Sequence, residues 1–337
     1  MDGRSAAAHR GPPAREPVSD EVAPLPDAVQ ALLDQRAAAR QARDWATADT
    51  LRDQLHALGW EPIDSPAGST ARPLLGGAAT ASYADDADLA SLLDEPASLP
   101  ASLVTVADDH PADAERLLGA LQRHPQAVDH EMLVVANAPA GDLALPPNVA
   151  TTLHVAERLG WADAVNLGLR RTRGAVAVLL DTSVEPQGDF LGPLLAAFDN
   201  PAVGVAGPWG VTSRDGREFS EAPAGEVDAI EGYCLAVRRE ALRQVRGFDH
   251  RFRFYRNADL DLSFAIRANG WTAVATGPLP LVRHEHRGWM AHQPAERDRL
   301  SKRNFYRFLK HWGDRRDLLL RPAQRDERGR PARDAGR

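Results

Sequence analysis

The sequence predicts an α/β protein with a mostly parallel sheet flanked by helices, preceded by a small helical hairpin. From about Ala101 onward, apolar strand-like runs alternate with helix-like segments, an order typical of βαβ units. The run Gly174–Leu180 has no polar alternation, as expected of a central strand that is covered on both faces. Upstream, residues 29–58 carry apolar side chains at helical spacing.

Composition sets the first limits. The chain has 337 residues, of which 43% are hydrophobic, so it can hold one large or two modest cores. A formal net charge of -7 argues against a protein that binds nucleic acid mainly through a basic surface. Cys234 is the only cysteine and has apolar neighbours, which excludes a disulfide framework and a thiolate metal cluster.

Membrane and export signals are not recognisable in the sequence. No apolar run approaches the roughly 18 to 20 residues that span a bilayer. Residues 1–20 lack the apolar core of a signal peptide. We therefore expect a cytoplasmic protein.

Changes in composition predict five segments along the chain. They are a disordered leader at 1–24, a helical hairpin module at 25–73, a low-complexity linker at 74–100, the α/β domain at 101–318 and a disordered tail at 319–337.

The hairpin module is predicted from two helical stripes. Val29, Leu32 and Leu33 begin the first. Asp44 is a suitable N-cap for the second, which Gly59 can end. We expect the side chains along the second helix to form the hairpin's own core, in particular Trp45 and Leu51.

Within the α/β domain, short apolar runs predict strands and longer segments with apolar residues three or four apart predict helices. The strands are expected at 103–106, 131–135, 174–180, 203–206, 234–237, 272–275 and 281–282. The helices are expected at 113–122, 162–171, 190–198, from 239, at 259–269 and at 296–312.

The last predicted helix carries an aromatic stripe, Phe305, Phe308, Leu309 and Trp312, among basic residues. Packing on the sheet is the simpler interpretation. Peripheral contact with a membrane is the alternative.

Asp181 is the first candidate functional residue because it directly follows the run Gly174–Leu180. Ligands of open α/β sheets collect at the carboxyl ends of the strands. An acidic side chain there is placed for a metal ion or a phosphate-bearing ligand, although it can also simply cap a turn.

Seven blocks in this order and spacing resemble family 2 glycosyltransferases over about residues 101–312. They are Leu103–Val106, Glu131–Asn137, Gly160–Gly168, Leu179–Pro186, Glu231–Gly232, Gly247–Asp249 and Asn257–Leu262. The resemblance implies a GT-A fold, a nucleotide-diphospho-sugar donor, a divalent cation and inversion at the sugar carbon. It leaves the acceptor open.

The resemblance also implies a metal site. Asp181 would be one ligand, because carboxylate oxygens suit a hard divalent cation that neutralises a departing diphosphate. His284 or His286 would be another, with His284 preferred because it is nearer the preceding strand. An imidazole ligand would shift selection from magnesium toward manganese. Alternatively, both histidines belong to a charged surface run.

Further roles follow from the same resemblance. Asp259 matches the catalytic base, which takes a proton from the acceptor hydroxyl. Asp261 and Gly232 would orient the loop or contact the acceptor. The nucleotide sugar would be bound by Asp108, Asn137, Gly160 and Asn166.

Three positions depart from the family pattern. Where acids are usual, this chain has Ala136, Ser183 and Ala258. Ser183 matters most, because it replaces the expected second acid at the cation. These departures keep open a second interpretation, a non-catalytic GT-A domain that binds a sugar nucleotide or a partner protein.

Residues 29–73 resemble the small C-terminal module of cysteine tRNA synthetases, which lies near the anticodon end of tRNA. The blocks are Gln35–Arg36, Asp44–Ala46, Leu51–Asp53, Gly59 and Gly68–Thr70. Its arginines are offset by neighbouring aspartates, so strong phosphate binding does not follow. An RNA-associated protein is therefore the third and least favoured interpretation.

Overall fold

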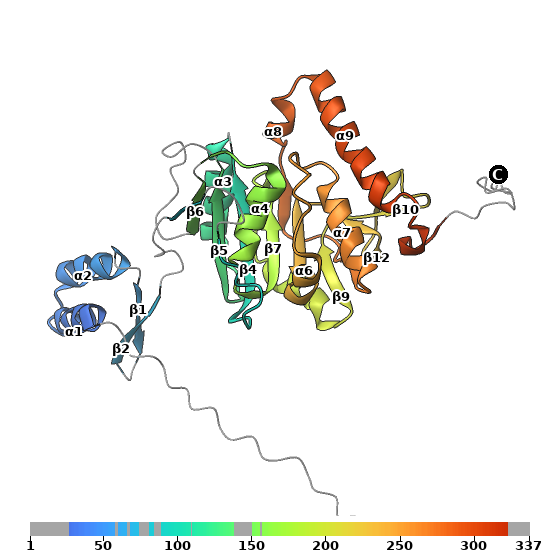
Figure 1. Ribbon diagram of the computed structural model, residues 1–337. Helices are drawn as coiled ribbons and strands as arrows, with labels where there is room; N and C mark the ends of the chain where they lie inside the picture. Colours follow the sequence, from blue (N-terminus) through green and yellow to red (C-terminus); the bar gives the residue numbers. More distant parts are fainter. Residues whose placement is uncertain are drawn as a thin grey trace, which may run out of the picture. The chain divides into compact units, whose positions relative to one another are not determined.

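The computed structural model describes residues 27–57, 60–65, 68–73, 81–83, 89–108, 110–137, 150–155 and 157–322. The chain divides into two compact units between Arg72 and Pro73, which Figure 1 colours along the sequence. The predicted leader, 1–24, lies outside the described residues.

The first unit confirms the predicted helical hairpin. Helices α1 (Asp27–Gln41) and α2 (Trp45–Ala57) pack together and are followed by a two-stranded sheet of β1 (Trp60–Ser65) and β2 (Gly68–Pro73). Asp44 caps α2, accepting hydrogen bonds from the Thr47 backbone N–H at 3.1 Å and the Thr47 hydroxyl at 2.7 Å. These bonds satisfy one of the free N–H groups of the first turn.

An ion pair joins the hairpin to the sheet of this unit. The buried Arg36 guanidinium donates to both carboxylate oxygens of Asp64, at 2.9 and 3.1 Å. Ser69 donates to the same carboxylate at 2.8 Å. The hydrogen bond from Arg36 is the main cause that holds the pKa of Asp64 below its usual value.

The expectation for the hairpin core is wrong at one residue. Leu51 is buried, as predicted, but Trp45 is 57% exposed, with the Arg40 guanidinium 5.8 Å from its ring centroid. Trp45 is the first residue of α2 and precedes the buried stripe, Ala48, Leu51 and Leu55. Its side chain therefore lies beyond the interface of the two helices.

The second unit is built on a nine-stranded sheet. Its spatial order is β12 (Gly225–Val227), β15 (Thr272–Ala275), β9 (Val203–Gly207), β14 (Cys234–Arg238), β7 (Gly174–Leu180), β4 (Leu99–Ala107), β5 (His130–Ala136), β6 (Thr151–Val155) and β3 (Ala81–Tyr83). From β7 to β3 all neighbours are parallel. Strand β14 runs antiparallel to both β7 and β9, while β15 is parallel to β9 and β12 antiparallel to β15.

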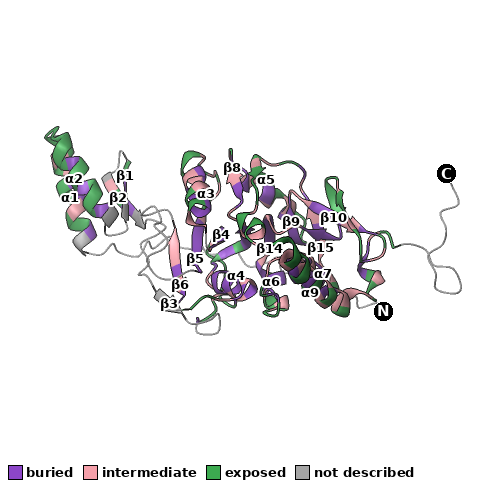
Figure 2. Ribbon diagram, turned by 90° about the horizontal axis from the view of Figure 1, so that it is seen from above, coloured by how far each residue is buried: buried purple, intermediate pink, exposed green. Residues whose placement is uncertain are grey.

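Helices cover both faces of this sheet (Figure 2). On one side lie α3 (Pro111–Arg123) and α5 (Leu191–Leu195), which continues as a 3-10 turn, Ala196–Asp199. On the other lie α4 (Trp161–Arg170), α6 (Arg239–Val245) and α7 (Ala258–Ala268). In β7, Val176, Val178 and Leu180 pack in the core under α3 and α5, whereas Ala177 and Leu179 pack in the core under α4, α6 and α7. This two-sided burial explains the unbroken apolar run.

Smaller elements complete the second unit. Strands β11 (Phe219–Ala222), β10 (Gly210–Ser213) and β13 (Ala229–Ile230) form a three-stranded sheet, and β8 (Val184–Pro186) pairs with β16 (Leu281–Arg283). They are followed by α8 (Arg287–Met290), α9 (Pro294–Trp312) and a 3-10 turn, Arg316–Leu318.

The aromatic stripe of α9 packs against the domain. The Phe308 ring is fully buried and lies 5.1 Å from that of Phe264 and 5.8 Å from that of Phe219, centroid to centroid. Phe305, Leu309 and Trp312 pack on the same cluster. The stripe is therefore not an exposed face for a membrane. Among the described residues, no helix combines the length and apolar character that crossing a bilayer requires.

Two predicted boundaries need correction. The predicted linker, 74–100, contains β3 and the buried Leu89 and Leu93, so part of it is built into the α/β unit. The predicted tail, 319–337, begins too early, because Leu319 is buried and the Leu320 N–H donates to Asp228 at 2.8 Å. Residues 323–337 of that tail lie outside the described residues.

Arg239 fastens the segment before β4 to the sheet, which gives a first prediction. Its buried guanidinium donates to the carbonyls of Leu92, Glu95 (3.2 Å), Thr172 (2.8 Å) and Gly174 (3.3 Å). We expect Arg239→Ala to lower the free energy of unfolding by about 2 to 4 kcal/mol, because several charge-assisted hydrogen bonds are lost together. Urea titration of the full chain measures this.

Arg243→Ala is the matched control. Arg243 lies on the same helix, is half exposed and has an ion pair of 3.8 Å with Asp94, so its loss should change stability by less than about 0.5 kcal/mol. Equal unfolding midpoints for the two variants would contradict the role given to Arg239.

Candidate functional site

The candidate site lies where three parallel strands end. Strands β4, β5 and β7 are followed directly by Asp108, Asn137 and Asp181. The carboxyl ends of parallel neighbours meet at one edge of a sheet. The antiparallel strand β14 begins at this same edge, and the Asp181 N–H donates to the carbonyl of Tyr233 at 2.9 Å. Asp181 therefore lies at the carboxyl end of a central strand, as the sequence predicted.

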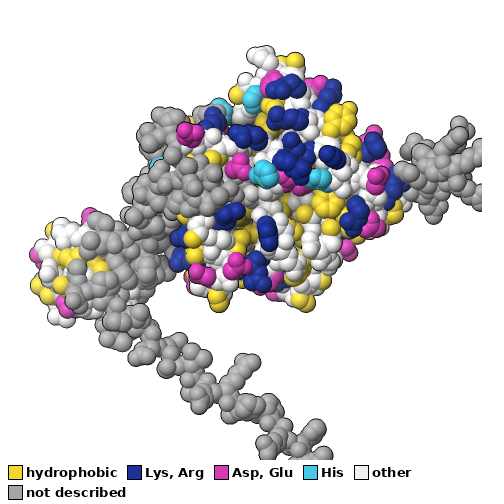
Figure 3. Space-filling model, in the orientation of Figure 1, with side chains coloured by type: hydrophobic (Ala, Val, Ile, Leu, Met, Phe, Trp, Pro, Cys, Tyr) yellow, Lys and Arg dark blue, Asp and Glu magenta, His cyan; other side chains and the backbone are white. Residues whose placement is uncertain are grey.

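Two cavities open at this edge. Pocket A has a volume of about 390 Å³ and is lined by Asp108, Asn137 and Arg287, among others. Pocket B has a volume of about 370 Å³ and is lined by Glu231, Gly232 and Asp259, among others. Four residues line both: Trp161, Asp181, Tyr255 and His286. The two cavities are therefore neighbours across these side chains. Figure 3 shows basic, acidic and histidine side chains gathered on one face of the second unit.

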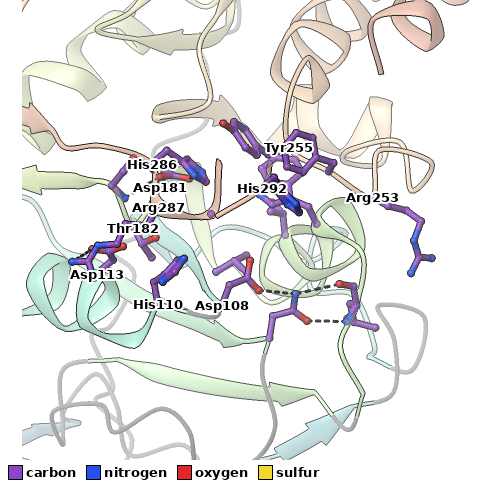
Figure 4. Close-up of a pocket in the computed structure, with 18 of the residues that line it drawn as sticks. Asp108, His110, Asp113, Asp181, Thr182, Arg253, Tyr255, His286, Arg287 and His292 are labelled. Atoms are coloured by element: carbon purple, nitrogen blue, oxygen red, sulfur yellow. Dashed lines mark hydrogen bonds and ion pairs between the residues drawn. The ribbon is translucent and has the colours of Figure 1, made fainter. Parts of the chain in front are cut away.

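Asp181 is paired with His286. Its Oδ2 lies 3.4 Å from Nε2 of His286. The His286 ring stacks on that of Tyr255, with ring centroids 4.3 Å apart and planes at 9°. Figure 4 shows these side chains at one side of pocket A. His284, the preferred ligand from the sequence, instead bonds Glu185 at 2.8 Å. The choice of His284 beside Asp181 is therefore corrected to His286.

Burial and pairing act in opposite directions on this pair. Burial raises the pKa of Asp181, but the hydrogen bond and charge of His286 and the bonds from Ser183 outweigh it, so the net shift is downward. Burial lowers the pKa of His286, and the hydrogen bond and charge of Asp181 outweigh it, so the net shift is upward. Both shifts come from the contact between Nε2 of His286 and the Asp181 carboxylate.

A divalent cation, which the family resemblance implies, fits this donor set poorly. Oδ1 of Asp181 already accepts from the Ser183 N–H at 2.8 Å and the Ser183 hydroxyl at 2.5 Å. Nδ1 of His286 accepts from the Trp289 N–H at 3.1 Å, whereas a metal-bound imidazole normally donates from its second nitrogen. One carboxylate oxygen is left, and the imidazole has the wrong polarity for a ligand.

A second acidic cluster is also unsuited to a cation. Asp249, Asp261 and His311 offer atoms within 4.8 Å of one another, the one such group of three found among the described residues. However, the Arg251 guanidinium already donates to both oxygens of Asp249, at 2.6 to 2.9 Å, and lies 2.8 Å from His311. A fixed positive charge thus occupies the place of an ion.

Asp261 lies outside the linings of both pockets. It is buried, accepts a hydrogen bond from the Trp312 indole at 2.8 Å and lines neither pocket. Of its two predicted roles, the structure fits orientation of the loop, and contact with the acceptor stays a prediction. The side chain anchors the end of α9 beside the loop that carries Asp249.

Asp259 opens into pocket B. Its carboxylate accepts from the Gly232 N–H at 2.8 Å and the Leu260 N–H at 2.9 Å. Burial raises the pKa of Asp259 against the lowering effect of these bonds. Glu231, on the same pocket, also has a raised pKa, because it is partly buried and lies near the charge of Asp259. The structure thus brings together Asp259 and Gly232, two of the residues predicted from the sequence to have site roles.

Asp108 and Asn137 meet in pocket A. The Asn137 amide donates to Asp108 at 3.0 Å and to the Leu159 carbonyl at 3.2 Å, and its oxygen accepts from the Leu159 N–H at 2.8 Å. These bonds hold Asp108 and Leu159 at the lining of the cavity.

Gly160 and Asn166, in contrast, line neither pocket. The buried Asn166 amide bonds both the carbonyl (2.8 Å) and the N–H (2.9 Å) of Phe248. A Cβ on Gly160 would lie 3.3 Å from the Arg253 Cα, and the Trp161 and Ala162 N–H groups donate to the carbonyls of Arg253 and Phe252. Both residues hold the segment that leads to Tyr255, and their binding of the nucleotide sugar stays a prediction.

Sequence reasoning missed a group of residues on pocket A. The buried Asp113 lies 2.6 Å from the Arg116 guanidinium and 3.0 Å from that of Arg287, and Arg116 donates to the Thr182 carbonyl at 2.9 Å. Nε2 of His110 is buried without a hydrogen-bond partner among the described residues. The signal was present, since His110 and Asp113 follow β4 at the same sheet edge as Asp108.

The fold is that of GT-A glycosyltransferases. The structure superposes on the crystal structure of GalNAc-T7 with UDP, GalNAc and Mn²⁺ with a TM-score of 0.53 and 13% identity, covering 65% of this chain and 50% of that one. At this identity the likeness concerns the fold alone.

Sequence comparison then confirms both predicted resemblances. Residues 142–262 match the model of glycosyl transferase family 2, and residues 23–60 match the cysteinyl-tRNA ligase anticodon binding domain. Over residues 142–262, the α/β unit is thus similar to glycosyl transferase family 2.

Two relatives illustrate the matches. N-acetylglucosaminyl-diphospho-decaprenol L-rhamnosyltransferase of Mycobacterium tuberculosis (strain CDC 1551 / Oshkosh) is 30% identical over 148 residues, which cover 37% of this chain and 47% of that protein. Cysteine--tRNA ligase of Cutibacterium acnes (strain DSM 16379 / KPA171202) is 51% identical over 51 residues, 15% of this chain and 10% of that protein. The chain thus spans about half the length of the glycosyltransferase relative and a tenth of the ligase.

The pairing of Asp181 with His286 gives a second prediction. We expect the pKa of His286 to lie above its ordinary value in the intact protein and to fall in Asp181→Asn, because the hydrogen bond and charge of Asp181 that raise it are then lost. NMR titration of labelled histidine, assigned with His286→Gln, measures both values. An unchanged pKa in the Asp181 variant would show that the carboxylate does not charge this ring.

Proposed function

We propose that this protein transfers a sugar from a nucleotide-diphospho-sugar bound in pocket A to an acceptor hydroxyl in pocket B, with inversion at the sugar carbon. The adjacency of the two pockets across Asp181, Trp161, Tyr255 and His286 carries this proposal. The acceptor hydroxyl can then attack the sugar carbon from the side opposite the leaving nucleoside diphosphate, as inversion requires. The family match over residues 142–262 supports it.

Pocket A suits the donor. It lies at the carboxyl ends of β4, β5 and β7, where open α/β sheets bind nucleotides. Asp108, at the end of β4, is held by the Asn137 amide and can accept hydrogen bonds from the nucleoside. Its volume, about 390 Å³, lies in the ordinary range of small-molecule sites.

Asp259 is the proposed base. Its backbone hydrogen bonds fix the carboxylate toward pocket B. Burial raises the pKa of Asp259, which makes the carboxylate a stronger proton acceptor. As the acceptor oxygen bonds to the sugar carbon, Asp259 takes the hydroxyl proton. The bond from that carbon to the phosphate oxygen breaks, and the nucleoside diphosphate leaves with the electron pair.

Ser183 supports a second candidate function, a GT-A domain that binds a sugar nucleotide without turnover. Its N–H and hydroxyl occupy one oxygen of Asp181, in the place where the family usually has a second acid. In that case pocket A would still bind the nucleotide, and Asp259 would have no chemical role.

A panel of UDP-, GDP- and dTDP-sugars, each with and without manganese, separates the two functions. We expect one donor to release its nucleotide, and Asp259→Asn to slow this release by about 10²- to 10⁴-fold, the usual size of a general-base effect. Nucleotide release measured over time gives the rate, and calorimetric titration gives the affinity for the nucleotide.

Asp298→Asn is the matched control, since Asp298 is exposed on α9 and pairs with Lys302. It should retain the full rate. Nucleotide binding without turnover by any donor would favour the binding domain, and equal rates for wild type and Asp259→Asn would remove Asp259 from the mechanism.

A further inference from the structure

One wall of pocket A carries positive charge that is fixed in place. The Arg287 guanidinium lies 3.0 Å from Asp113, and the Arg116 guanidinium lies 2.6 Å from the same carboxylate. Two guanidinium groups thus share one buried carboxylate, which leaves one positive charge in excess. Arg116 is also tied to the turn after β7, through the Thr182 carbonyl at 2.9 Å. The charge therefore stands beside Asp181.

Arg287 is the member of this group that a ligand can reach. Its side chain is 49% exposed and lines pocket A, whereas that of Arg116 is 22% exposed and does not line it. Figure 4 shows Arg287 and Asp113 on the same side of the cavity as Asp181 and His286. A guanidinium held by a buried carboxylate loses little freedom when it binds an anion.

His110 adds an unused polar atom to the same cavity. It lies between Asp113 and Asp108 in Figure 4 and lines pocket A. Its Nε2 is buried and has no hydrogen-bond partner among the described residues. Buried polar atoms without partners are rare in folded proteins, so this atom is placed to bond a ligand in the pocket.

We propose that Arg287 and His110 bind the diphosphate of the donor directly, and that this binding needs no divalent cation. The inference rests on the proposed function and specifies how its donor is held. Guanidinium groups match phosphate oxygens in geometry and charge. A cation would have to use an Asp181 carboxylate with one oxygen already bonded by Ser183 and an imidazole whose Nδ1 accepts a hydrogen bond.

The same contact serves the transfer step. When the bond between the sugar carbon and the phosphate oxygen breaks, the electron pair stays on the diphosphate, and Arg287 faces the added negative charge. Asp113 acts as a positioning residue, because it touches Arg287 and not the donor.

Calorimetric titration of the full chain with UDP, GDP and dTDP, in EDTA and separately in manganese, tests this. We expect at least one nucleoside diphosphate to bind in EDTA with a Kd within about threefold of that in manganese. Arg287→Gln should raise this Kd about tenfold or more, since a charge-assisted hydrogen bond is lost. The Kd of the corresponding nucleoside, which lacks the diphosphate, should not change.

Two further variants exclude a merely structural effect. Arg287→Lys keeps the charge and should recover part of the affinity, and Asp113→Asn should weaken nucleoside diphosphate binding but not nucleoside binding. Arg243→Gln, an exposed arginine of α6 outside both pockets, is the control and should bind as wild type does.

Each contrary result has a distinct meaning. Binding that appears only with manganese, or an unchanged Kd in Arg287→Gln, would overturn the cation-independent site and leave the proposed transferase intact. Absence of binding for every nucleoside diphosphate in both conditions would overturn this site and the proposed function together. Binding in EDTA without turnover of any sugar nucleotide would support the site and contradict the transferase.

Discussion

The pairing of β14 with β7 is the constraint on which the site depends. β14 runs against its neighbours, with Cys234 opposite Leu180 at the end of β7. The start of β14 therefore lies beside the carboxyl end of β7, where the Asp181 N–H donates to the Tyr233 carbonyl. The preceding Gly232 donates to Asp259. One antiparallel strand thus brings the carboxylate of pocket A and that of pocket B to the same sheet edge.

The segment between α6 and α7 is fixed from three sides. The Asn166 side chain of α4 donates to the Phe248 carbonyl and accepts from the Phe248 N–H. The Trp161 and Ala162 N–H groups bond the carbonyls of Arg253 and Phe252. The buried Asn304 of α9 donates to the carbonyls of Phe254 (2.6 Å) and Arg256 (2.9 Å). These bonds position Tyr255, which stacks on His286 between the pockets. This segment is thus held in place by hydrogen bonds from α4 and α9.

Much of the fold was predictable because strand ends follow from local patterning. The apolar run of β7 predicted Asp181 at its carboxyl end, and the same rule explains Asp108 and Asn137. The direction of β14 was not predictable, since a short apolar run looks alike in parallel and antiparallel strands. Two departures from the family pattern have a packing reason: Ala136 and Ala258 are buried, at 2% and 1% exposure, where an acid would lose its hydration.

His284 was preferred in the sequence because it is nearer the strand, and this guide selected the wrong histidine. Pairing of β16 with β8 ends at Arg283, and the chain then turns so that His286 caps α8 and lies beside Asp181. Asn166 was predicted to bind the nucleotide sugar, and its side chain bonds the Phe248 backbone. An asparagine that fixes a loop and one that binds a ligand look the same in a motif.

A crystal structure of the protein with the nucleoside diphosphate that binds it tests the central claim most directly. We expect the nucleoside in pocket A near Asp108 and Asn137, the diphosphate within hydrogen-bonding distance of Arg287 and His110, and the terminal phosphate facing pocket B beside Asp181. A nucleotide bound in pocket B, or a diphosphate that contacts neither Arg287 nor His110, would contradict this account of the site.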